Sequence, residues 1–171
     1  MASVCRMGKV LVAYATRGGT ARDIAEAIGS VLRSTGHQVL VADLKSRPSV
    51  DGAALVVLGS GINAGSWYQE ATAWVAAEEG SLRDVRVAVF NACLNAADPA
   101  KRVESLAYNA SMAERLGAEA SESFAGRFVP EHVSWWRRWF LRTMQKPMQD
   151  NLDLGAVRAW ASTLHVPSSA L

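Results

Sequence analysis

Hydrophobic runs alternate with segments of helical periodicity along most of the chain. The runs are rich in Val, Leu and Ala and predict strands at Lys9–Tyr14, Gln38–Ala42, Ala53–Gly59, Val85–Asn91 and Glu119–Ala125. The segments that separate or follow them predict helices at Thr20–Thr35, Ser66–Glu79, Ala100–Leu116 and Leu152–Leu164. Strands that alternate with helices in this way are typical of a doubly wound α/β domain with a parallel sheet.

The first helix has a clear amphipathic pattern. Ile24, Ile28 and Leu32 share one face, which we expect to cover the sheet. Gly36 follows the last periodic position and is expected to end the helix. The run at 53–59 contains no charged residue, so it predicts a strand that is covered on both faces.

The turn between the first strand and the first helix is rich in hydroxyl groups and glycine. Backbone N–H groups at a helix N-terminus point outward, and the helix dipole favours an anion there. Thr16 and Thr20 add hydroxyl donors, and Arg17 adds a cation. Gly18 and Gly19 allow the backbone to approach a phosphate closely. The turn is therefore a candidate phosphate site, with an ordinary strand-to-helix turn as the alternative.

Two further loops are expected at the same edge of the sheet, because ligands of such folds bind outside the carboxyl ends of the strands. The loop at 60–68 is long and carries glycines and aromatic residues. Its candidate binding residues are Ser60, Gly61, Ile62, Asn63, Ala64, Gly65 and Trp67. The loop at 91–96 contributes Asn91, Ala92, Cys93, Leu94 and Asn95. No His or Lys adjoins the cysteine, so we interpret it as a small buried hydrophobe rather than a redox-active thiol.

Composition narrows the classes of function. The chain of 171 residues has a net charge of +2, which does not favour nucleic-acid binding. Its length predicts a single domain at 8–166, between tails at 1–7 and 167–171. Cys5 and Cys93 show no metal or disulfide spacing, so we expect no metal and a cytoplasmic protein. No run is long and apolar enough to span a membrane, and no hydrolase arrangement is visible.

Together, the three loops resemble those of the flavodoxin-like FMN-binding family, and the resemblance extends from about residue 8 to 165. In that family the first loop holds the FMN phosphate, and the other two grip the isoalloxazine ring. The resemblance implies a five-stranded parallel sheet of order 2-1-3-4-5 with FMN at the switch point. It also implies that Trp67 or Tyr68 supplies an aromatic residue that stacks on the ring.

Within this family, the chain is similar to the menaquinone-dependent protoporphyrinogen oxidases. The similarity lies in Thr16-Arg17, Gln69-Glu70-Ala71, Pro99-Ala100-Lys101-Arg102 and the segment that starts at Ala125-Gly126-Arg127-Phe128. At 61–64 the sequence is Gly-Ile-Asn-Ala, where that group tends to have an Arg-aromatic pair. The similarity implies that a porphyrinogen-like substrate gives hydride to FMN, that a quinone accepts the electrons, and that the protein serves heme biosynthesis.

An inserted segment at about 127–149 precedes the last expected helix. Its residues 134–146 predict a basic amphipathic helix with tryptophan on one face and arginine on the other. The candidate contact residues are Trp135, Trp136, Arg138, Trp139, Phe140 and Arg142. Such a helix can lie on the inner face of the cell membrane, because tryptophan favours the headgroup level and arginine suits anionic lipid. The alternatives are contact with substrate and packing on the domain or on a second copy in a homodimer.

Two other functions remain open. One is an electron-transfer protein that works with protein redox partners. Such carriers tend to be acidic so that complementary charge can guide docking, and the net charge of +2 does not match that. The other is an interaction module that has lost its flavin. No side chain has the setting of an obligatory acid or base, so the catalytic residues are unknown from sequence.

Overall fold

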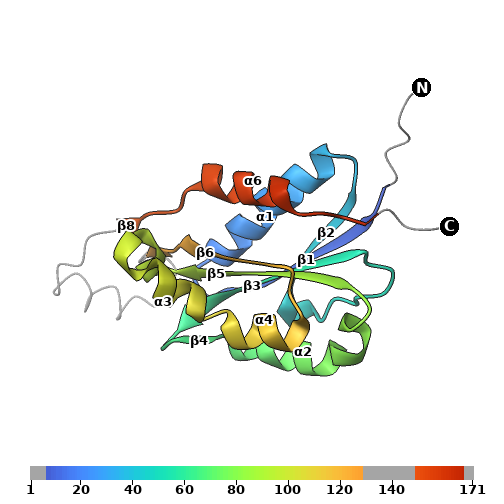
Figure 1. Cartoon of the computed structure of the whole chain (residues 1–171), viewed down its shortest axis with the longest axis horizontal. Coiled ribbons are helices and arrows are strands. Elements are labelled where there is room, and N and C mark those ends of the chain that lie inside the picture. The colour runs from blue at the N-terminus through green and yellow to red at the C-terminus, as the bar shows by residue number, and fades with distance from the viewer. Residues whose placement is uncertain (1–6, 129–148, 168–171) are drawn as a thin grey trace.

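The computed structural model describes residues 7–128 and 149–167. Within these residues, five parallel strands form one sheet in the order β2-β1-β3-β5-β6 (Figure 1). They are β1 (Lys9–Ala15), β2 (Gln38–Asp43), β3 (Leu55–Asn63), β5 (Arg86–Cys93) and β6 (Ala120–Ala125). The strand order expected from the sequence is confirmed.

Helices cover both faces of the sheet (Figure 1). One face carries α1 (Thr20–Ser34) and α6 (Leu154–Thr163), and the opposite face carries α2 (Gln69–Leu82) and α4 (Ala110–Leu116). A short helix, α3 (Arg102–Ala107), contacts β5 and β6. The part of the chain that the structure describes also contains three 3-10 turns: η1 (Leu44–Ser46), η2 (Leu94–Ala97) and η3 (Pro99–Lys101). In the described residues, no helix is both long enough and apolar enough to cross a membrane.

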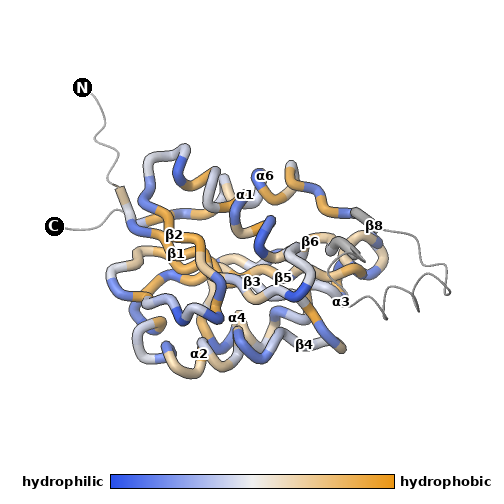
Figure 2. The backbone as a smooth tube through the Cα atoms, turned by 180° about the vertical axis from the view of Figure 1, so that it is seen from behind, coloured by the Kyte–Doolittle hydropathy of each residue, from blue (hydrophilic) through white to orange (hydrophobic). Residues whose placement is uncertain are grey.

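The core consists of two hydrophobic layers, one on each side of the sheet. Val10 and Val12 of β1 pack toward α1 and α6, whereas Leu11 and Ala13 pack toward α2. This alternation follows from the pleat of a strand, which points successive side chains to opposite faces. Because both faces are covered, the central strands contain continuous apolar runs, at 10–13 in β1, 55–58 in β3 and 87–90 in β5, and Figure 2 shows orange stretches along the sheet.

Aromatic rings pack the centre of the sheet against α6. Gly59 of β3 lies opposite Phe90 of β5, and a Cβ on Gly59 would come within 1.9 Å of the Phe90 ring. Phe90, Phe124 and Trp160 form a cluster with ring centroids 5.7 to 6.4 Å apart. On the other face Trp74 is buried, and its indole N–H donates to the carbonyl of Pro48 at 3.0 Å.

The segment expected as a long loop at 60–68 is mostly a β-hairpin, which corrects the sequence interpretation. Here β3 continues to its end and turns back into β4 (Ser66–Trp67), with Asn63 paired to Ser66. Ala64 and Gly65 form the turn with φ angles of 49° and 78°. Positive φ at both central residues is typical of the two-residue hairpin turns that match strand twist.

Two helices also differ from their expected bounds. The helix expected at 66–79 begins only at Gln69, because β4 pairing and the extended backbone of Tyr68 precede it. The helix expected at 100–116 is divided into η3, α3 and α4. The N–H of Asn109 donates to the carbonyl of Leu106, three residues back, and this tight turn interrupts the helical ladder.

The inserted segment begins and ends at a pair of short strands. β7 (Arg127–Phe128) follows β6, and β8 (Gln149–Asp150) precedes α6. The two pair in antiparallel fashion, with Arg127 opposite Asp150. The chain between them, at 129–148, lies outside the described residues.

Candidate functional site

The turn between β1 and α1 has the geometry of an anion site. Gly19 occupies the N-cap position of α1 at φ 85°, and its N–H donates to Oγ1 of Thr16 at 2.9 Å. A Cβ on Gly18 would meet no atom within 4 Å, so the space beside this residue is open. Thr20 opens the helix and is buried. The open glycine and the helix N-terminus together fit a phosphate group.

Arg17 connects this turn to the start of α2. Its guanidinium carbon lies 4.6 Å from the centroid of the Tyr68 ring, and its Nη2 lies 2.7 Å from Oε1 of Glu70. Glu70 is also held by its own backbone N–H, which is the main reason that the pKa of its carboxyl lies below the ordinary value. The hydrogen bond from Arg17 lowers that pKa further. The sequence interpretation named Glu70 only as part of the Gln69-Glu70-Ala71 resemblance and did not predict its contact with Arg17.

Tyr68 lies against the end of β3. A Cβ on Gly61 would come within 2.6 Å of its ring, and the N–H of Tyr68 donates to Oγ of Ser60 at 3.0 Å. Ser60 is fully buried, so this bond fixes the backbone of Tyr68. Burial raises the pKa of the Tyr68 phenol, and the charge of Arg17 acts in the opposite direction.

The tip of the hairpin is exposed to solvent, and its base is buried. Asn63, Ala64 and Gly65 are exposed at the tip, whereas Ile62 is half-buried. Trp67 is 8% exposed, and its indole N–H points into the protein. Of the two aromatic residues that the sequence offers for stacking on a ring, Tyr68 is therefore the one nearer the surface.

The third candidate segment divides into a buried and an exposed part. Asn91, Ala92 and Cys93 end β5 and are buried, and the cysteine is a free thiol. Its burial fits the interpretation as a small hydrophobe. Leu94 is exposed and Asn95 is half-buried, and both belong to η2. Only these two of the five therefore reach the surface of the site.

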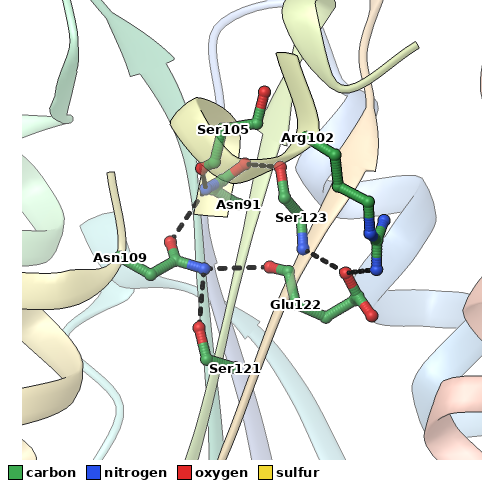
Figure 3. A network of polar contacts seen from close by, with 7 residues as sticks. All are labelled: Asn91, Arg102, Ser105, Asn109, Ser121, Glu122 and Ser123. Atoms are coloured by element: carbon green, nitrogen blue, oxygen red, sulfur yellow. Dashed lines mark hydrogen bonds and ion pairs between the residues drawn. The ribbon is translucent and has the colours of Figure 1, made fainter. Parts of the chain in front are cut away.

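A buried polar network supports the second and third segments (Figure 3). Its centre is Asn109, which is fully buried. Its Oδ1 accepts hydrogen bonds from Trp67 at 3.1 Å and from Asn91 at 2.9 Å. Its Nδ2 donates to Oγ of Ser121 and to the carbonyl of Glu122. No sequence pattern pointed to Asn109, because a lone amide in an expected helix is usually a surface residue.

Tyr108 is a second site residue that the sequence interpretation missed. A Cβ on Gly65 would lie 3.6 Å from the Tyr108 ring, so Tyr108 lies beside the hairpin turn. Its hydroxyl donates to Oε1 of Glu104 at 2.8 Å, and this bond raises the pKa of the phenol. The side chain of Asn95 opposes that rise, which shows that Tyr108 also contacts η2. Tyr108 thus bridges the hairpin and the third segment.

The candidate contact residues of the insert, Trp135, Trp136, Arg138, Trp139, Phe140 and Arg142, lie outside the described residues. Elsewhere, in the described ranges 7–128 and 149–167, no cluster of His, Cys, Asp and Glu could hold a metal ion.

The sheet order and the three segments at the carboxyl ends of β1, β3 and β5 define a flavodoxin-like α/β domain. The chain belongs to the flavodoxin-domain family, whose family model matches residues 11–154. Flavodoxin domains bind FMN, and the family therefore confirms the cofactor expected from the sequence.

Solved structures share this fold at low sequence identity. Oxidised flavodoxin 1 from Bacillus cereus is 16% identical with a TM-score of 0.60, and the match covers 90% of this chain and 95% of that one. A flavodoxin from the domain Archaea is 14% identical with a TM-score of 0.58, covering 90% and 93%. Rubredoxin oxygen:oxidoreductase from Desulfovibrio gigas is 15% identical with a TM-score of 0.56. That match covers 93% of this chain but only 38% of the length of that protein. No curated protein matches the chain.

Proposed function

We propose that this protein is an FMN-dependent oxidoreductase that oxidises a reduced substrate of the protoporphyrinogen type and uses a quinone as electron acceptor. One observation carries the flavin-binding part of the proposal: contacts join all three candidate segments at one edge of the sheet. The substrate and the electron acceptor are proposed from the sequence similarity to the menaquinone-dependent protoporphyrinogen oxidases. Arg17 of the first segment stacks on Tyr68 beside the second, and Tyr108 bridges Gly65 and Asn95 of the second and third. The contacts provide a common frame for a phosphate and a flat ring.

In this proposal each segment has a separate role. Thr16, Gly18, Gly19 and Thr20 hold the phosphate through N–H and hydroxyl donors. Arg17 flanks it, and its contact with Glu70 fixes the guanidinium beside the turn.

The remaining candidates frame the ring. Tyr68 and Tyr108 supply aromatic walls, and Leu94 and Asn95 close the third side. The hydroxyl oxygen of Ser60 accepts a hydrogen bond from the N–H of Tyr68 and so fixes the backbone beside the ring. FMN, when bound, supplies the acceptor for hydride, while these side chains orient the ring and exclude water.

The oxidase activity is tested with the full chain loaded with FMN. Protoporphyrinogen IX and menadione are supplied without oxygen, and porphyrin fluorescence is followed. The proposal expects porphyrin to form only when protein, FMN and quinone are all present. A loaded protein that yields no porphyrin above the protein-free rate would refute the substrate assignment while leaving FMN binding intact.

A second candidate function is electron transfer to protein partners. It is favoured by membership of the flavodoxin-domain family. Under this alternative, the loaded protein would accept electrons from a flavodoxin reductase and NADPH but would not oxidise a porphyrinogen.

We also propose that the protein is cytoplasmic and meets the inner face of the cell membrane through the Trp/Arg segment. The support is the sequence pattern of 134–146, in which tryptophan and arginine occupy opposite faces of an expected helix. Contact at the membrane would bring the protein to a lipophilic quinone. A homodimer that covers the same tryptophans is the competing arrangement.

A further inference from the structure

The turn between β1 and α1 balances only part of the charge of a phosphate. A phosphate monoester carries about −1.5 to −2 charges at pH 7. The N-terminus of a helix is equivalent to only about +0.5 charges. The hydroxyl groups of Thr16 and Thr20 add hydrogen-bond donors but no net charge. A cation close to the turn would therefore strengthen the binding of a phosphorylated ligand.

Arg17 is the cation that the sequence suggests for this role, but its charge is already balanced in the structure. Its Nη2 lies 2.7 Å from Oε1 of Glu70 and donates to Oε2 at 2.9 Å. Its guanidinium also lies over the ring of Tyr68. If Arg17 turned toward a phosphate, Glu70 would lose its partner and would repel the ligand. Arg17 therefore flanks the turn as one half of a pair without net charge.

Arg22 reaches the same turn from the beginning of α1. A Cβ on Gly19 would lie 3.5 Å from Nη2 and 3.9 Å from Cζ of Arg22, so the guanidinium lies against the N-cap residue of the helix. Gly19 has no side chain to keep the guanidinium away from the backbone. Burial raises the pKa of the Tyr14 phenol, and the charge of Arg22 acts to lower it. The positive charge thus also acts near the end of β1.

The ion pair of Arg22 is looser than that of Arg17. Nε of Arg22 lies 3.5 Å from Oδ1 of Asp23, compared with 2.7 Å in the pair of Arg17. This contact involves the Nε edge of the guanidinium, whereas the Nη2 end lies beside Gly19. The side chain of Arg22 is 54% exposed. It can therefore turn its N–H donors toward a phosphate without breaking a buried contact.

We propose that Arg22 pairs with the phosphate of the bound flavin and makes the site selective for FMN over flavins without a phosphate, an inference that rests on the phosphate site proposed above. A guanidinium offers a planar fork of N–H donors that matches two phosphate oxygens. Arg22 supplies the positive charge that the helix N-terminus and the balanced pair of Arg17 and Glu70 do not. The cation of the phosphate site is therefore a residue of α1 rather than of the turn itself.

The test titrates FMN and riboflavin with the full chain and follows flavin fluorescence in wild type, Arg22→Gln and Arg22→Lys. Gln removes the charge, whereas Lys keeps the charge without the fork. We expect FMN binding to weaken about tenfold in Arg22→Gln, equivalent to about 1.4 kcal/mol, and about threefold in Arg22→Lys. Riboflavin binding should stay unchanged in both. Arg33→Gln is the matched control, because it removes an exposed arginine from the last turn of the same helix and should change neither affinity.

Ionic strength provides a second measurement. Salt screens a contact between exposed charges, so the affinity of wild type for FMN should fall as the concentration of KCl rises. The fall should be less steep in Arg22→Gln, because one charged contact with the phosphate is missing. Riboflavin affinity should depend little on KCl in either protein.

Three outcomes would overturn the inference. Arg22→Gln could bind FMN as tightly as wild type, it could lose affinity for FMN and riboflavin equally, or Arg33→Gln could show the same loss. A wild-type protein that binds riboflavin as tightly as FMN would instead refute the phosphate site itself, so the two failures are distinguishable. If Arg22→Gln does not fold, the loss of FMN affinity in Arg22→Lys decides, because that variant keeps the charge and lacks only the fork.

Discussion

The indole N–H of Trp67 donates a hydrogen bond to Oδ1 of Asn109 at 3.1 Å, and both side chains are buried. The bond joins the base of the β4 hairpin to the turn between α3 and α4, 42 residues further along the chain. Since Asn91 at the end of β5 donates to the same oxygen, one amide group holds both segments that we propose to frame the flavin ring.

Replacing the amide of Asn109 should therefore destabilise the fold. Asn109→Ala leaves the N–H groups of Trp67 and Asn91 without their shared acceptor, and we expect the free energy of unfolding to fall by about 3 kcal/mol. Urea denaturation measures it. Ser121→Ala is the matched control, because it removes one exposed partner of the same network and should cost about 0.5–1 kcal/mol. Equal losses in the two variants would contradict a central role for Asn109.

Gly59 is expected to tolerate no side chain. A Cβ there would lie within 1.9 Å of the buried Phe90 ring, so Gly59→Ala should destabilise the fold by about 1–3 kcal/mol or more. In Gly80→Ala the new Cβ meets no atom within 4 Å and lies in α2, so that variant should gain about 0.4–1 kcal/mol. Thermal unfolding of the two variants compares them directly. A Gly59→Ala protein as stable as wild type would show that the ring can move aside.

The ion pair between Arg17 and Glu70 has a defined pH dependence. The pKa of Glu70 lies below its ordinary value of 4.5, so the folded state favours the ionised carboxylate. The resulting stabilisation is complete above the ordinary pKa and is lost as pH falls through the lowered one. Arg17→Gln should raise the pKa of Glu70, with a stability loss of only about 0.2–1 kcal/mol because the pair is partly exposed.

Carboxyl NMR titration measures this change residue by residue. Arg115→Gln provides the control, because Arg115 pairs with Glu79 and lowers the pKa of that carboxyl instead. It should shift Glu79 and leave Glu70 unchanged. If Arg17→Gln left the pKa of Glu70 where it was, the backbone N–H alone would account for the lowering.

The Trp/Arg segment leads to a prediction about membranes. Replacing Trp135, Trp136 and Trp139 by Ser should abolish binding of the full chain to vesicles that contain anionic lipid, measured by co-sedimentation. Vesicles of uncharged lipid provide the comparison, and the wild-type protein should bind them more weakly. Unchanged sedimentation of the triple variant would exclude these residues as the membrane contact. A change in oligomeric state would instead favour the homodimer.

The regular part of the fold could be predicted because β1, β3 and β5 each contain an uninterrupted apolar run. The irregular parts of the fold have weaker sequence patterns. Residues 60–63 are small or polar except for Ile62, yet they extend β3. Ser60 and Gly61 pair with β5, whereas Ile62 and Asn63 pair with β4, which has only two residues. Likewise no Gly or Pro marks the break before α4, which depends on the tertiary partners of Asn109.

The candidate site likewise contains residues that could be predicted from the sequence and residues that could not. The phosphate turn is local, so its residues could be selected from Thr16 to Thr20 by chemistry alone. Glu70 and Tyr108 act through contacts with residues far along the chain, Arg17 and Gly65, and only the folded structure reveals them. Trp67 illustrates the reverse case: a conspicuous aromatic in the sequence has its indole N–H committed to Asn109.

The most direct test of the account compares FMN with riboflavin, which lacks the phosphate, in wild type and in Gly18→Ala. Each flavin is titrated with protein and its fluorescence followed. The new Cβ meets no protein atom within 4 Å, so the fold should persist, but it occupies the space in which we place the phosphate. We predict stoichiometric quenching of FMN by wild type, about tenfold weaker FMN binding by the variant, and unchanged riboflavin binding. FMN fluorescence that wild type leaves unquenched, or equal losses for both flavins, would contradict the account.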